Sequence, residues 1–425
     1  MPTLAIRNVM LLDGTGDTAR AGSSVHVTDG RIGWVGDASA EPQDVTVDRV
    51  IDGTGRTLLP GFIDSHVHLC ADPERPGRYD PLRVSTERLA MEVLSHAQDA
   101  LRAGVTTLAD CGGRDYVTLD VRDAILAGSV LGPRIMTTGL GISITGGHFH
   151  WYSIEADDVA ELRKATRTLV KRGVDFIKLF GTGGGSTMGS NPALAQYTVE
   201  EFRTVIEEAE RGGIRVTTHV HGTPGIRNAV EAGIHRLEHV QFFDAEGDIR
   251  FDAELARQIL DAGIPISLGM AKRWRTEQAI EGFLTPRQLQ QRDLRDKRIQ
   301  VLRNFREAGV KLVASTDAGM TMTPFDDLPY LMSFLTSEIS MTIPEVVHSV
   351  TGRAATALGI DADHGTIEVG KLADLVLADG DVSAGLDPLF GELDVFRAGR
   401  RLVHRGRLTG PATRHATNAT DREAP

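Results

Sequence analysis

The stretch Gly61-Phe-Ile-Asp-Ser-His-Val-His-Leu69 follows Pro60 and has the apolar character of a buried β-strand with two histidines near its end. Because side chains alternate along a strand, His66 and His68 point to the same face. After this stretch, strand-like apolar runs alternate with longer amphipathic stretches, which is the pattern of repeated βα units over a parallel sheet. The chain is therefore predicted to adopt an α/β fold whose first βα unit begins here.

Eight strand-like runs follow one another over about 300 residues, which is enough for a (β/α)8 TIM barrel of about 250 residues with insertions. A doubly wound open sheet is the alternative, but it usually has a glycine fingerprint after its first strand, and here that strand ends in His-Val-His-Leu69. The sequence thus favours the barrel. The expected strands are residues 61–69, 105–111, 134–141, 176–181, 216–222, 236–240, 265–269 and 311–317, and the expected helices include 86–103, 159–172, 199–211 and 288–308.

Sequence of β type flanks this region on both sides. Residues 4–35 alternate short strands with turns, including the hairpin signal Asp29-Gly30, and β-type sequence returns at 365–377 and 396–407 after a helix expected over 343–358. Because chain termini often lie close together, we expect both ends to form one small β-sandwich domain. The expected domains are 1–58 plus 362–412 for the composite β-sandwich, 59–361 for the barrel, and 413–425 for a disordered tail.

The composition narrows the class of partners. The 425 residues include 41% hydrophobic and 24% charged residues, and no segment approaches the ~20 apolar residues of a membrane helix. The formal charge of −12 opposes a nucleic-acid backbone. No secretory signal is visible at the start, and only two cysteines, Cys70 and Cys111, occur, which fits a reducing compartment. We expect a cytoplasmic homo-oligomer that acts on a small molecule, without nucleic acid or membrane partners.

Further residues suited to binding metals lie near the ends of later predicted strands: Lys178, His219, His239 and Asp317. In a barrel these ends form one rim, where active sites are built. Imidazole and carboxylate are ligands of zinc and similar divalent ions, and a catalytic ion keeps one position open for water. Four histidines and one aspartate are enough for two ions only if a further group bridges them.

Lys178 is a candidate for that bridging group. The chain has only 7 lysines, and this one lies inside the apolar run Phe176-Ile-Lys-Leu-Phe180. Desolvation would lower the pKa of its ammonium, and the neutral amine could capture carbon dioxide as an anionic carbamate. The alternative is a lysine that extends to the rim or pairs with an acid.

Taken together, these motifs resemble the amidohydrolase superfamily, in its imidazolonepropionase-like and prolidase-like branch. The opening Leu11-Leu-Asp-Gly-Thr-Gly16 and the closing Gly365-Thr-Ile-Glu-Val-Gly-Lys-Leu-Ala-Asp-Leu-Val-Leu377 are similar to the family's flanking β-sandwich segments. The motifs that carry the resemblance are Gly61-Phe-Ile-Asp-Ser-His-Val-His68, Phe176-Ile-Lys178, Thr218-His219, Glu238-His239 and Ser315-Thr-Asp-Ala-Gly319.

The resemblance implies two divalent metal ions, zinc first, with manganese, cobalt or iron as alternatives. His66 and His68 would bind the more buried ion, His219 and His239 the more exposed one, and a carbamate on Lys178 would bridge them. Asp317 would bind the first ion and transfer protons. His221 shares the strand face of His219; the family pattern favours His219 as the ligand and His221 as a substrate-facing residue, and an exchange of the two roles stays open.

Loops supply the other expected site residues. Thr145-Gly-Gly-His-Phe-His150 resembles the family's Gly-Gly-His loop, so His148 is expected to polarise the scissile carbonyl, whereas His150 has the character of a solvated loop residue. Tyr197 matches a family tyrosine near the substrate, or else packs on the barrel wall. Arg273 and Arg275 could hold a substrate carboxylate, or could be ordinary surface residues. The glycine-rich residues 181–189 match no phosphate-loop pattern and are read as an active-site loop.

The resemblance implies a binuclear metal-dependent amidohydrolase, of dipeptidase type, that cleaves the amide bond of a dipeptide or N-acyl amino acid, including aromatic N-acyl amides. Cyclic-amide, carbamate or lactone hydrolysis at the same site is the alternative, since one fold hosts many activities. A more distant alternative is a non-catalytic metal-binding scaffold. Such a homologue is expected to lack ligands, and here all six are present.

Overall fold

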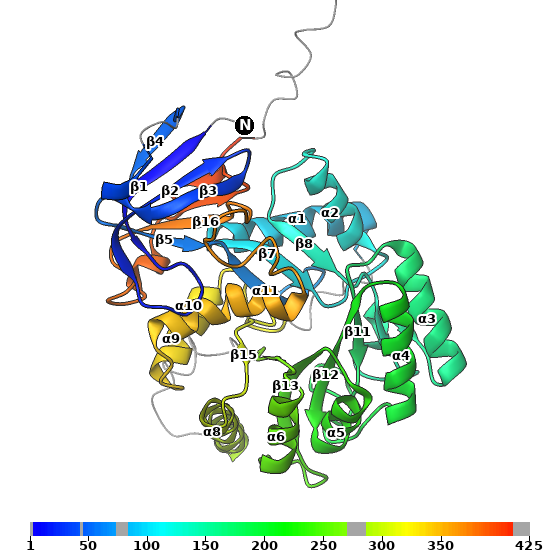
Figure 1. The fold of residues 1–425 in the computed structure, drawn as a ribbon. Coiled ribbons are helices and arrows are strands. Elements are labelled where there is room, and N and C mark those ends of the chain that lie inside the picture. The colour runs from blue at the N-terminus through cyan, green and yellow to red at the C-terminus, as the bar shows by residue number, and fades with distance from the viewer. Residues whose placement is uncertain (1–2, 43–45, 74–83, 270–285, 411–425) are drawn as a thin grey trace, which may run out of the picture.

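The computed structural model of the protein describes residues 3–42, 46–73, 84–269 and 286–410. It is an α/β fold in which the described strands form three sheets, of nine, seven and three strands (Figure 1). Helices cover the two smaller sheets. Among the described residues, no helix combines the length and the apolar character that crossing a bilayer requires.

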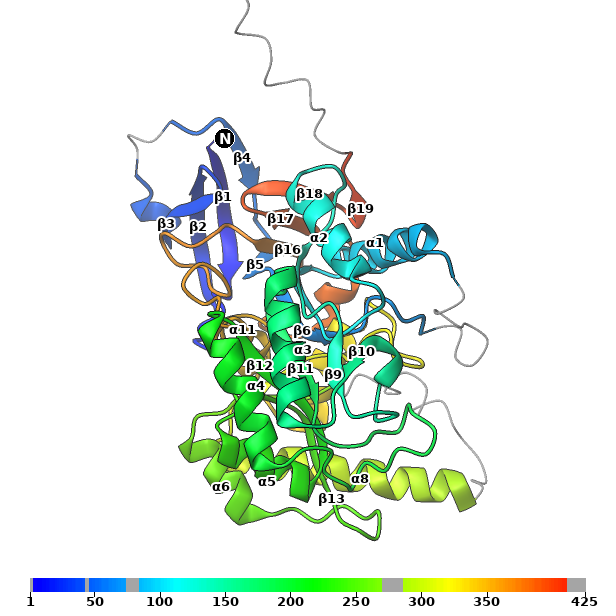
Figure 2. The ribbon, with the colours of Figure 1, turned by 90° about the vertical axis from the view of Figure 1, so that its right-hand side faces the viewer.

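The nine-stranded sheet combines both ends of the chain. Strand β16 pairs antiparallel with β5, so C-terminal strands extend the sheet that the N-terminal strands begin. In Figures 1 and 2 the blue and the orange to red strands accordingly lie side by side. Its strands are β1 (Leu4–Leu11), β2 (Arg20–Thr28), β3 (Arg31–Asp37), β4 (Arg49–Asp52), β5 (Arg56–Pro60), β16 (Leu375–Asp379), β17 (Asp394–Arg397), β18 (Arg400–His404) and β19 (Arg407–Leu408).

The hairpin predicted at Asp29-Gly30 is confirmed. β2 and β3 pair antiparallel across it, and the two turn residues have φ values of 50° and 79°. Positive φ at both positions is the geometry that matches the twist of a two-residue hairpin, and aspartate and glycine adopt it readily.

The other two sheets are parallel. Each of the eight predicted strand runs overlaps an observed strand. Several of these strands are shorter than expected, β12 and β13 extend beyond the predicted runs, and two further short strands, β9 and β10, follow β8. The three-stranded sheet consists of β6 (Phe62–Val67), β7 (Val105–Asp110) and β8 (Arg134–Thr137). The seven-stranded sheet consists of β9 (Gly141–Ser143), β10 (Ser153–Glu155), β11 (Phe176–Phe180), β12 (Arg215–Gly222), β13 (Arg236–Phe243), β14 (Ile266–Ser267) and β15 (Leu312–Val313).

Hydrogen bonds join the two parallel sheets on both sides of the three-stranded sheet. Beyond β15, the Asp317 amide donates to the His66 carbonyl at 2.9 Å, and the His68 amide donates to the Ala318 carbonyl at 2.7 Å. At the other edge, the Asp175 amide donates to the carbonyl of Thr137 at 2.9 Å. The hydrogen-bonded ladder is therefore two sheets in contact and not one closed eight-stranded sheet.

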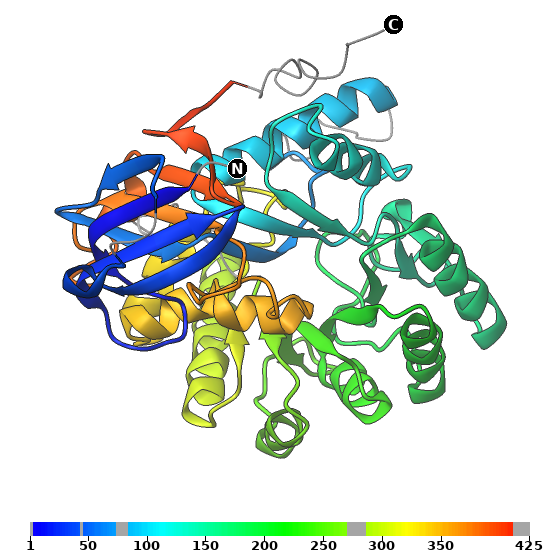
Figure 3. The same cartoon turned by 45° about the horizontal axis from the view of Figure 1, so that its top comes forward.

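Helices follow most of the parallel strands and lie outside them in chain order, as Figure 3 shows for the cyan, green and yellow parts of the chain. The helices predicted over 159–172 and 199–211 have these bounds in the structure, and Thr198 and Glu201 form a capping box at the start of the second. The helices are α1 (Thr86–Arg102), α2 (Val117–Leu126), α3 (Val159–Arg172), α4 (Val199–Arg211), α5 (Thr223–Ala232), α6 (Ala253–Asp261), α8 (Pro286–Glu307), α9 (Leu328–Ser337), α10 (Ile343–Ser349) and α11 (Gly352–Leu358), with 3₁₀ turns η1 (Ala38–Ala40), η2 (His150–Tyr152) and η3 (Asp387–Phe390).

The single helix predicted over 343–358 is wrong, because the structure divides it into α10 and α11. The break lies where strand residues use the helix carbonyls: the Ile63 amide donates to Val350 at 2.7 Å and the Ala314 amide donates to Ser349 at 3.3 Å. A carbonyl that accepts a hydrogen bond from a strand amide in this way does not continue the hydrogen bonding of the helix. Hydrophobic periodicity is the same for two consecutive helices as for one, so it did not reveal the break.

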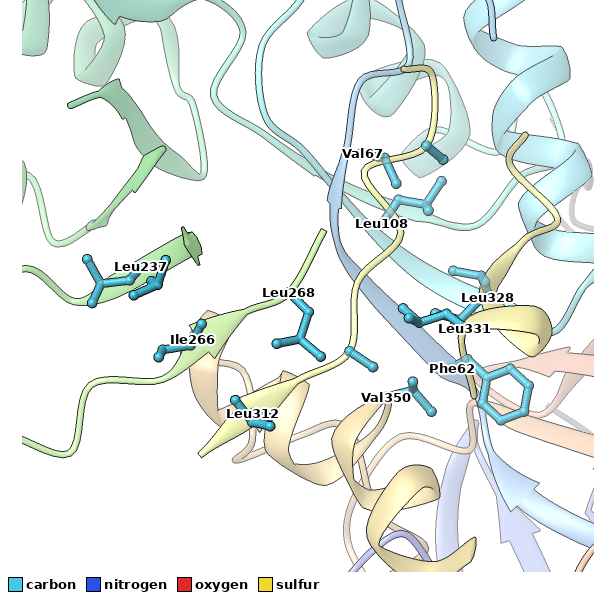
Figure 4. Packing of buried hydrophobic residues seen from close by; sticks show 14 of the residues in the cluster. Phe62, Val67, Leu108, Leu237, Ile266, Leu268, Leu312, Leu328, Leu331 and Val350 are labelled. Carbon is cyan, nitrogen blue, oxygen red and sulfur yellow. The ribbon is translucent and has the colours of Figure 1, made fainter. Parts of the chain in front are cut away.

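The apolar core lies between the parallel strands and the helices that cover them. Figure 4 shows Leu237, Ile266 and Leu312 on neighbouring strands β13, β14 and β15, within the same buried cluster as Leu331 of α9. Because side chains alternate along a strand, the residues next to these core residues face the interior of the ring of strands. On β13 that interior side chain is Glu238, which is completely buried.

Candidate metal centre

The six predicted metal ligands converge at the carboxyl ends of the parallel strands. The His66 and His239 rings lie 5.1 Å apart, and the His219 and His239 rings lie 4.6 Å apart, measured between centroids. Lys178 Nζ is 3.2 Å from His66 Nε2. Residues from strands that are distant in the sequence thus meet in one buried cluster, which we call the histidine centre. Its members are His66, His68, Lys178, His219, His221, His239 and Asp317.

The first half of the histidine centre contains His66, His68 and Asp317. One ligand atom from each of the three lies within 4.8 Å of the others. Asp317 Oδ1 is 3.5 Å from Nε2 of His66 and 3.5 Å from Nε2 of His68. The carboxylate therefore faces both imidazoles, which is the arrangement that an ion bound by all three residues requires.

The second half contains His219, His221 and His239, whose ligand atoms also lie within 4.8 Å of one another. Nε2 of His219 and Nδ1 of His221 are buried and have no hydrogen-bond partner among the described residues. A buried polar atom without a partner is costly, so these two atoms point to a ligand that the protein itself does not supply. The geometry admits His221 as well as His219, and both assignments stay open.

Lys178 lies beside the first half and affects the electrostatics of both halves. Its side chain is completely buried, and Nζ lies 5.6 Å from the centre of the Phe180 ring. Its charge contributes to the lowered pKa values of His68 in the first half and of His219 and His239 in the second. An ammonium here repels the cations expected beside it, which is why its chemical state decides the chemistry of the centre.

Imidazoles in both halves of the histidine centre are held neutral. Burial, followed by repulsion from neighbouring histidines and from Lys178, lowers the pKa of His68, His219 and His239 well below the ordinary value of 6.5. A neutral imidazole has a free lone pair, which is the form that binds a metal. Neutral imidazoles, one carboxylate and unpartnered buried nitrogens together fit a divalent metal ion.

Glu238 supports His66 from below and was not predicted as a site residue. Its Oε2 lies 2.9 Å from His66 Nδ1, while its Oε1 accepts from the Thr217 hydroxyl at 2.6 Å and from Arg236 Nε at 2.9 Å. Although burial alone would raise it, the pKa of Glu238 lies below its ordinary range because Arg236, His66 and Lys178 favour the carboxylate. A carboxylate beside Nδ1 leaves Nε2 of His66 for the centre.

Strand periodicity explains why Glu238 was missed. Along a regular strand, the adjacent residues Glu238 and His239 point to opposite faces, so a histidine facing the interior places the glutamate outside. In the structure His239 has a φ of 72° and Val240 a φ of 51°, which interrupts the alternation. Asp317 likewise has a φ of 61°. Left-handed backbone at two predicted ligands is strain of the kind that is found at functional sites.

Asp64 fixes the backbone that carries two of the ligands. Its carboxylate accepts from the hydroxyl of Thr316 at 2.5 Å, from the Thr316 amide at 3.1 Å and from the His66 amide at 3.3 Å. Burial raises the pKa of Asp64 to about 6. Asp64 therefore ties the end of β6 to the segment that carries Asp317.

The remaining predicted site residues lie in different surroundings. His148 is buried with its ring 4.5 Å from that of His219, and burial together with the charge of Lys178 lowers its pKa to about 3. His150 is partly exposed, 3.6 Å from Glu155. Tyr197 is buried in the wall beside Phe202, and its hydroxyl donates to the Ala156 carbonyl at 3.0 Å. Arg273 and Arg275 lie outside the described residues.

Comparison with known proteins gives consistent matches over most of the chain. A model of the amidohydrolase family matches residues 57–402. The ochratoxinase of Aspergillus niger is 26% identical over 397 residues, which cover 86% of this chain and 79% of that protein. The imidazolonepropionase of Cupriavidus taiwanensis is 27% identical over 430 residues, covering 92% of this chain and 93% of that protein.

Solved structures give the same picture. A Xaa-Pro dipeptidase with methionine bound in its active site matches with a TM-score of 0.81 and 26% identity, over 95% of this chain and all of that one. The crystal structure of the Aspergillus niger ochratoxinase matches with a TM-score of 0.84 over 96% of this chain and 97% of that one. At 23% identity the second match supports the fold alone.

Proposed function

The chain belongs to the amidohydrolase family, and from this premise we propose that it is a binuclear metal-dependent hydrolase that cleaves the amide bond of a dipeptide or N-acyl amino acid. The observation that carries the proposal is the histidine centre. Two groups of three possible ligands face each other around Lys178, and buried imidazole nitrogens in the second group have no protein partner among the described residues.

The residues present suit two ions. His66, His68 and Asp317 would hold one of them, His219 and His239 or His221 the other, and a carbamate on Lys178 would bridge both. Two bound divalent ions supply Lewis acidity and lower the pKa of a water to near neutrality. Zinc suits this nitrogen and oxygen donor set, and manganese, cobalt or iron are the alternatives.

Asp317 is proposed as the proton carrier. Its carboxylate faces His66 and His68, and its side chain keeps 19% of its surface exposed, whereas Glu238 has none. It takes the proton of the attacking water and returns that proton to the leaving nitrogen as a general acid. His148, which is neutral and lies beside His219, donates a hydrogen bond to the carbonyl oxygen as negative charge develops there. Tyr197, His221, Arg273 and Arg275 remain proposed contacts of the substrate.

The surface of the loops that follow the strands supports an apolar acyl group. Met188 and Leu194 after β11, and Met322 after β15, expose 100%, 57% and 45% of their surface. The two loops meet where Ser186 Oγ lies 3.9 Å from Met320 Sδ. These three exposed apolar residues belong to two loops that touch, and we propose that they form one surface for the acyl group. An aromatic N-acyl amino acid is therefore our first candidate, and the cyclic amide is the second because a relative is named imidazolonepropionase.

We also propose that the two parallel sheets complete a (β/α)8 barrel over residues 59–361. In support, β6 and β14 approach each other through the Ser65 and Ser267 hydroxyls, 3.0 Å apart, besides the backbone contacts of β6 with the segment after β15. Residues 1–58 and 362–412 form the proposed β-sandwich domain. Both cysteines are buried free thiols, which supports a cytoplasmic location, and we keep the proposed homo-oligomer.

One experiment tests the function directly. Metal content is measured on the purified protein, followed by hydrolysis of a panel of dipeptides, N-acyl amino acids, cyclic amides and lactones. We expect about two divalent ions per chain and fastest cleavage of N-acyl amino acids with apolar acyl groups. Full metal content without turnover of any panel member would favour the non-catalytic scaffold, and fastest turnover of a cyclic amide would favour the alternative hydrolase.

The bridging carbamate has its own test. The protein is incubated with ¹³C-bicarbonate, and we expect a carbamate resonance in the ¹³C spectrum that is absent from Lys178→Ala. Lys371→Ala is the matched control, since Lys371 is a half-buried lysine outside the histidine centre that pairs with Glu368 at 2.9 Å. A spectrum of the wild-type protein without the resonance, recorded with two ions bound, contradicts the carbamate.

A further inference from the structure

Thr187 connects the glycine-rich loop after β11 to His148. Its side chain is buried, and its hydroxyl oxygen lies 3.0 Å from His148 Nδ1 and accepts a hydrogen bond from the Phe149 amide at 3.0 Å. The family resemblance assigned a role to His148 but none to Thr187. The hydroxyl therefore touches two consecutive residues of the loop that carries the predicted carbonyl-polarising imidazole.

The bonding capacity of the hydroxyl fixes the direction of its contact with His148. A threonine hydroxyl has one hydrogen to donate and two lone pairs to accept with. The Phe149 amide uses one lone pair, and among the described residues His148 Nδ1 is the only group placed to accept the hydrogen. When Thr187 donates to Nδ1, the proton of the neutral imidazole must lie on Nε2. If Nδ1 donated instead, the buried hydroxyl hydrogen would be left without an acceptor.

Nε2 lies on the opposite side of the imidazole from the Thr187 contact. Nε2 of His148 has no hydrogen-bond partner among the described residues. The ring packs on the backbone of Gly184, where an added Cβ would lie only 2.4 Å from Nε2. A glycine here thus lets the imidazole lie against the loop, while the centroid of the His219 ring is 4.5 Å from that of the His148 ring.

We propose that Thr187 is a positioning residue that holds His148 as the Nε2–H tautomer, so that Nε2 donates to the carbonyl oxygen of the substrate. The inference rests on the proposed function, because it assigns a partner to the residue that the function uses as a hydrogen-bond donor. A donor fixed in advance at the position of the developing charge needs no reorganisation during the reaction. Removal of the hydroxyl frees both the ring and its tautomer.

The same contact holds a strained backbone. Phe149 has a φ of 59°, a left-handed conformation that is unfavourable for a residue other than glycine. Its amide is tied to Thr187, while Gln196 Oε1 accepts from the His148 amide at 2.9 Å. Two residues of the loop after β11 therefore determine the position of the histidine.

The test compares Thr187→Val with Thr187→Ser in the metal-loaded, full-length protein. Valine keeps the shape and removes the hydroxyl, so we expect kcat to fall about tenfold to a hundredfold, with KM and metal content little changed. Serine restores the hydroxyl and is expected to recover most of the lost kcat. The matched control is Thr166→Val in α3, where the buried hydroxyl donates to Leu162 at 2.8 Å and lies outside the histidine centre; its kcat should equal that of the wild type.

Two further measurements separate this proposal from a merely structural role. In ¹⁵N-histidine spectra, the signals that disappear in His148→Phe should show a protonated Nε2 in the wild type and a mixture of tautomers in Thr187→Val. In the His148→Phe background, Thr187→Val should cost no additional kcat. A fall in kcat for Thr187→Val without a tautomer change, or full additivity with His148→Phe, overturns the proposal. If His148→Phe itself leaves kcat unchanged, it is the proposed role of His148 that fails.

Discussion

Two buried polar clusters of this molecule use their hydrogen-bonding atoms in opposite ways. The first is the histidine centre. The second, which we call the Asp374 cluster, consists of Asp374, Arg134, His364 and Ala398 and joins the nine-stranded sheet to β8. There, Asp374 Oδ2 accepts from Arg134 Nη1 at 2.9 Å, and Oδ1 accepts from the Ala398 amide at 2.7 Å. His364 Nδ1 lies 3.4 Å from the same carboxylate.

The two clusters differ in the charges that they bring together and in how many of their polar atoms have hydrogen-bond partners. In the Asp374 cluster both carboxylate oxygens accept hydrogen bonds, one from a guanidinium and one from a backbone amide, and His364 Nδ1 is the one buried side-chain atom of the cluster without a hydrogen-bond partner among the described residues. In the histidine centre, imidazoles and Lys178 face mainly one another, and nitrogens of His219 and His221 have no partner among the described residues. A cluster of the first kind stabilises the fold by itself, whereas a cluster of the second kind is complete only with a ligand.

The strongest test of this contrast is Asp317→Asn. Loss of the proposed proton carrier is expected to lower kcat by about a hundredfold to ten-thousandfold, and a metal-loaded sample is expected to keep most of its ions because the histidines remain. Asp374→Asn, the same chemical change in the other cluster, should leave kcat close to that of the wild type. The kcat and the metal content of both variants are measured. A near-normal kcat for Asp317→Asn would show that Asp317 is not the proton carrier.

Metal removal should affect only the histidine centre. An ion at a thousand times its Kd stabilises the folded state by about 4 kcal/mol, so dialysis against a chelator should lower Tm and added zinc should restore it. Asp374→Asn is expected to show the same difference between the metal-loaded and the metal-free state as the wild type. A Tm that does not respond to removal of the ions contradicts a ligand-completed centre.

Substitution of Asp374 should lower the stability of the protein and leave its activity unchanged. Asp374→Asn puts an amide nitrogen or a weaker acceptor against Arg134 and is expected to cost about 2 to 3 kcal/mol of the free energy of unfolding at pH 7. Urea unfolding measures this cost. Asp387→Asn, at the start of η3, is a control substitution away from the cluster. Equal stability of both variants would show that the cluster contributes nothing.

The smallest expected effect is the change with pH in the stability that Asp374→Asn loses. The pKa of Asp374 lies below the ordinary 3.8 because His364, Arg134 and the Ala398 amide favour the carboxylate more than burial opposes it. A lowered pKa means that the stabilisation is fully present above the ordinary pKa and is lost as the pH falls below it. The stability difference between wild type and Asp374→Asn should therefore be constant from pH 5 to 7 and narrow toward pH 3. A difference that widens on acidification would contradict this assignment.

The two clusters also show what could be predicted from the sequence. His66 and His68 stood out because strand periodicity places both on one face, and Lys178 because a lysine is rare in this chain and in an apolar strand. Nothing comparable marked Asp374, whose partners Arg134 and Ala398 are separated from it in the sequence and become neighbours only when the sheets meet. A single sequence contains no signal for contacts of that kind.

Local backbone conformation set the other limit. The alternation rule failed at His239, where left-handed backbone leaves the consecutive side chains of Glu238 and His239 both facing inward. The break between α10 and α11 was missed because strand amides, and not the local sequence, interrupt the helix. Helices whose ends have side-chain caps, such as α3 and α4, were predicted to the residue, since their boundaries are encoded locally.

The position of β5 has a consequence for synthesis of the chain. One edge of β5 pairs with β1, which precedes it in the sequence, whereas its other edge pairs with β16, which is synthesised much later. The Thr57 hydroxyl, for example, donates to the Gly380 carbonyl, 323 positions later. At about 5 to 20 residues per second, that edge stays open on the ribosome for roughly 15 to 65 seconds. An open strand edge is a template for pairing with other chains. Expression conditions that shorten this interval or engage chaperones should therefore raise the yield of soluble protein without any change to its folded stability.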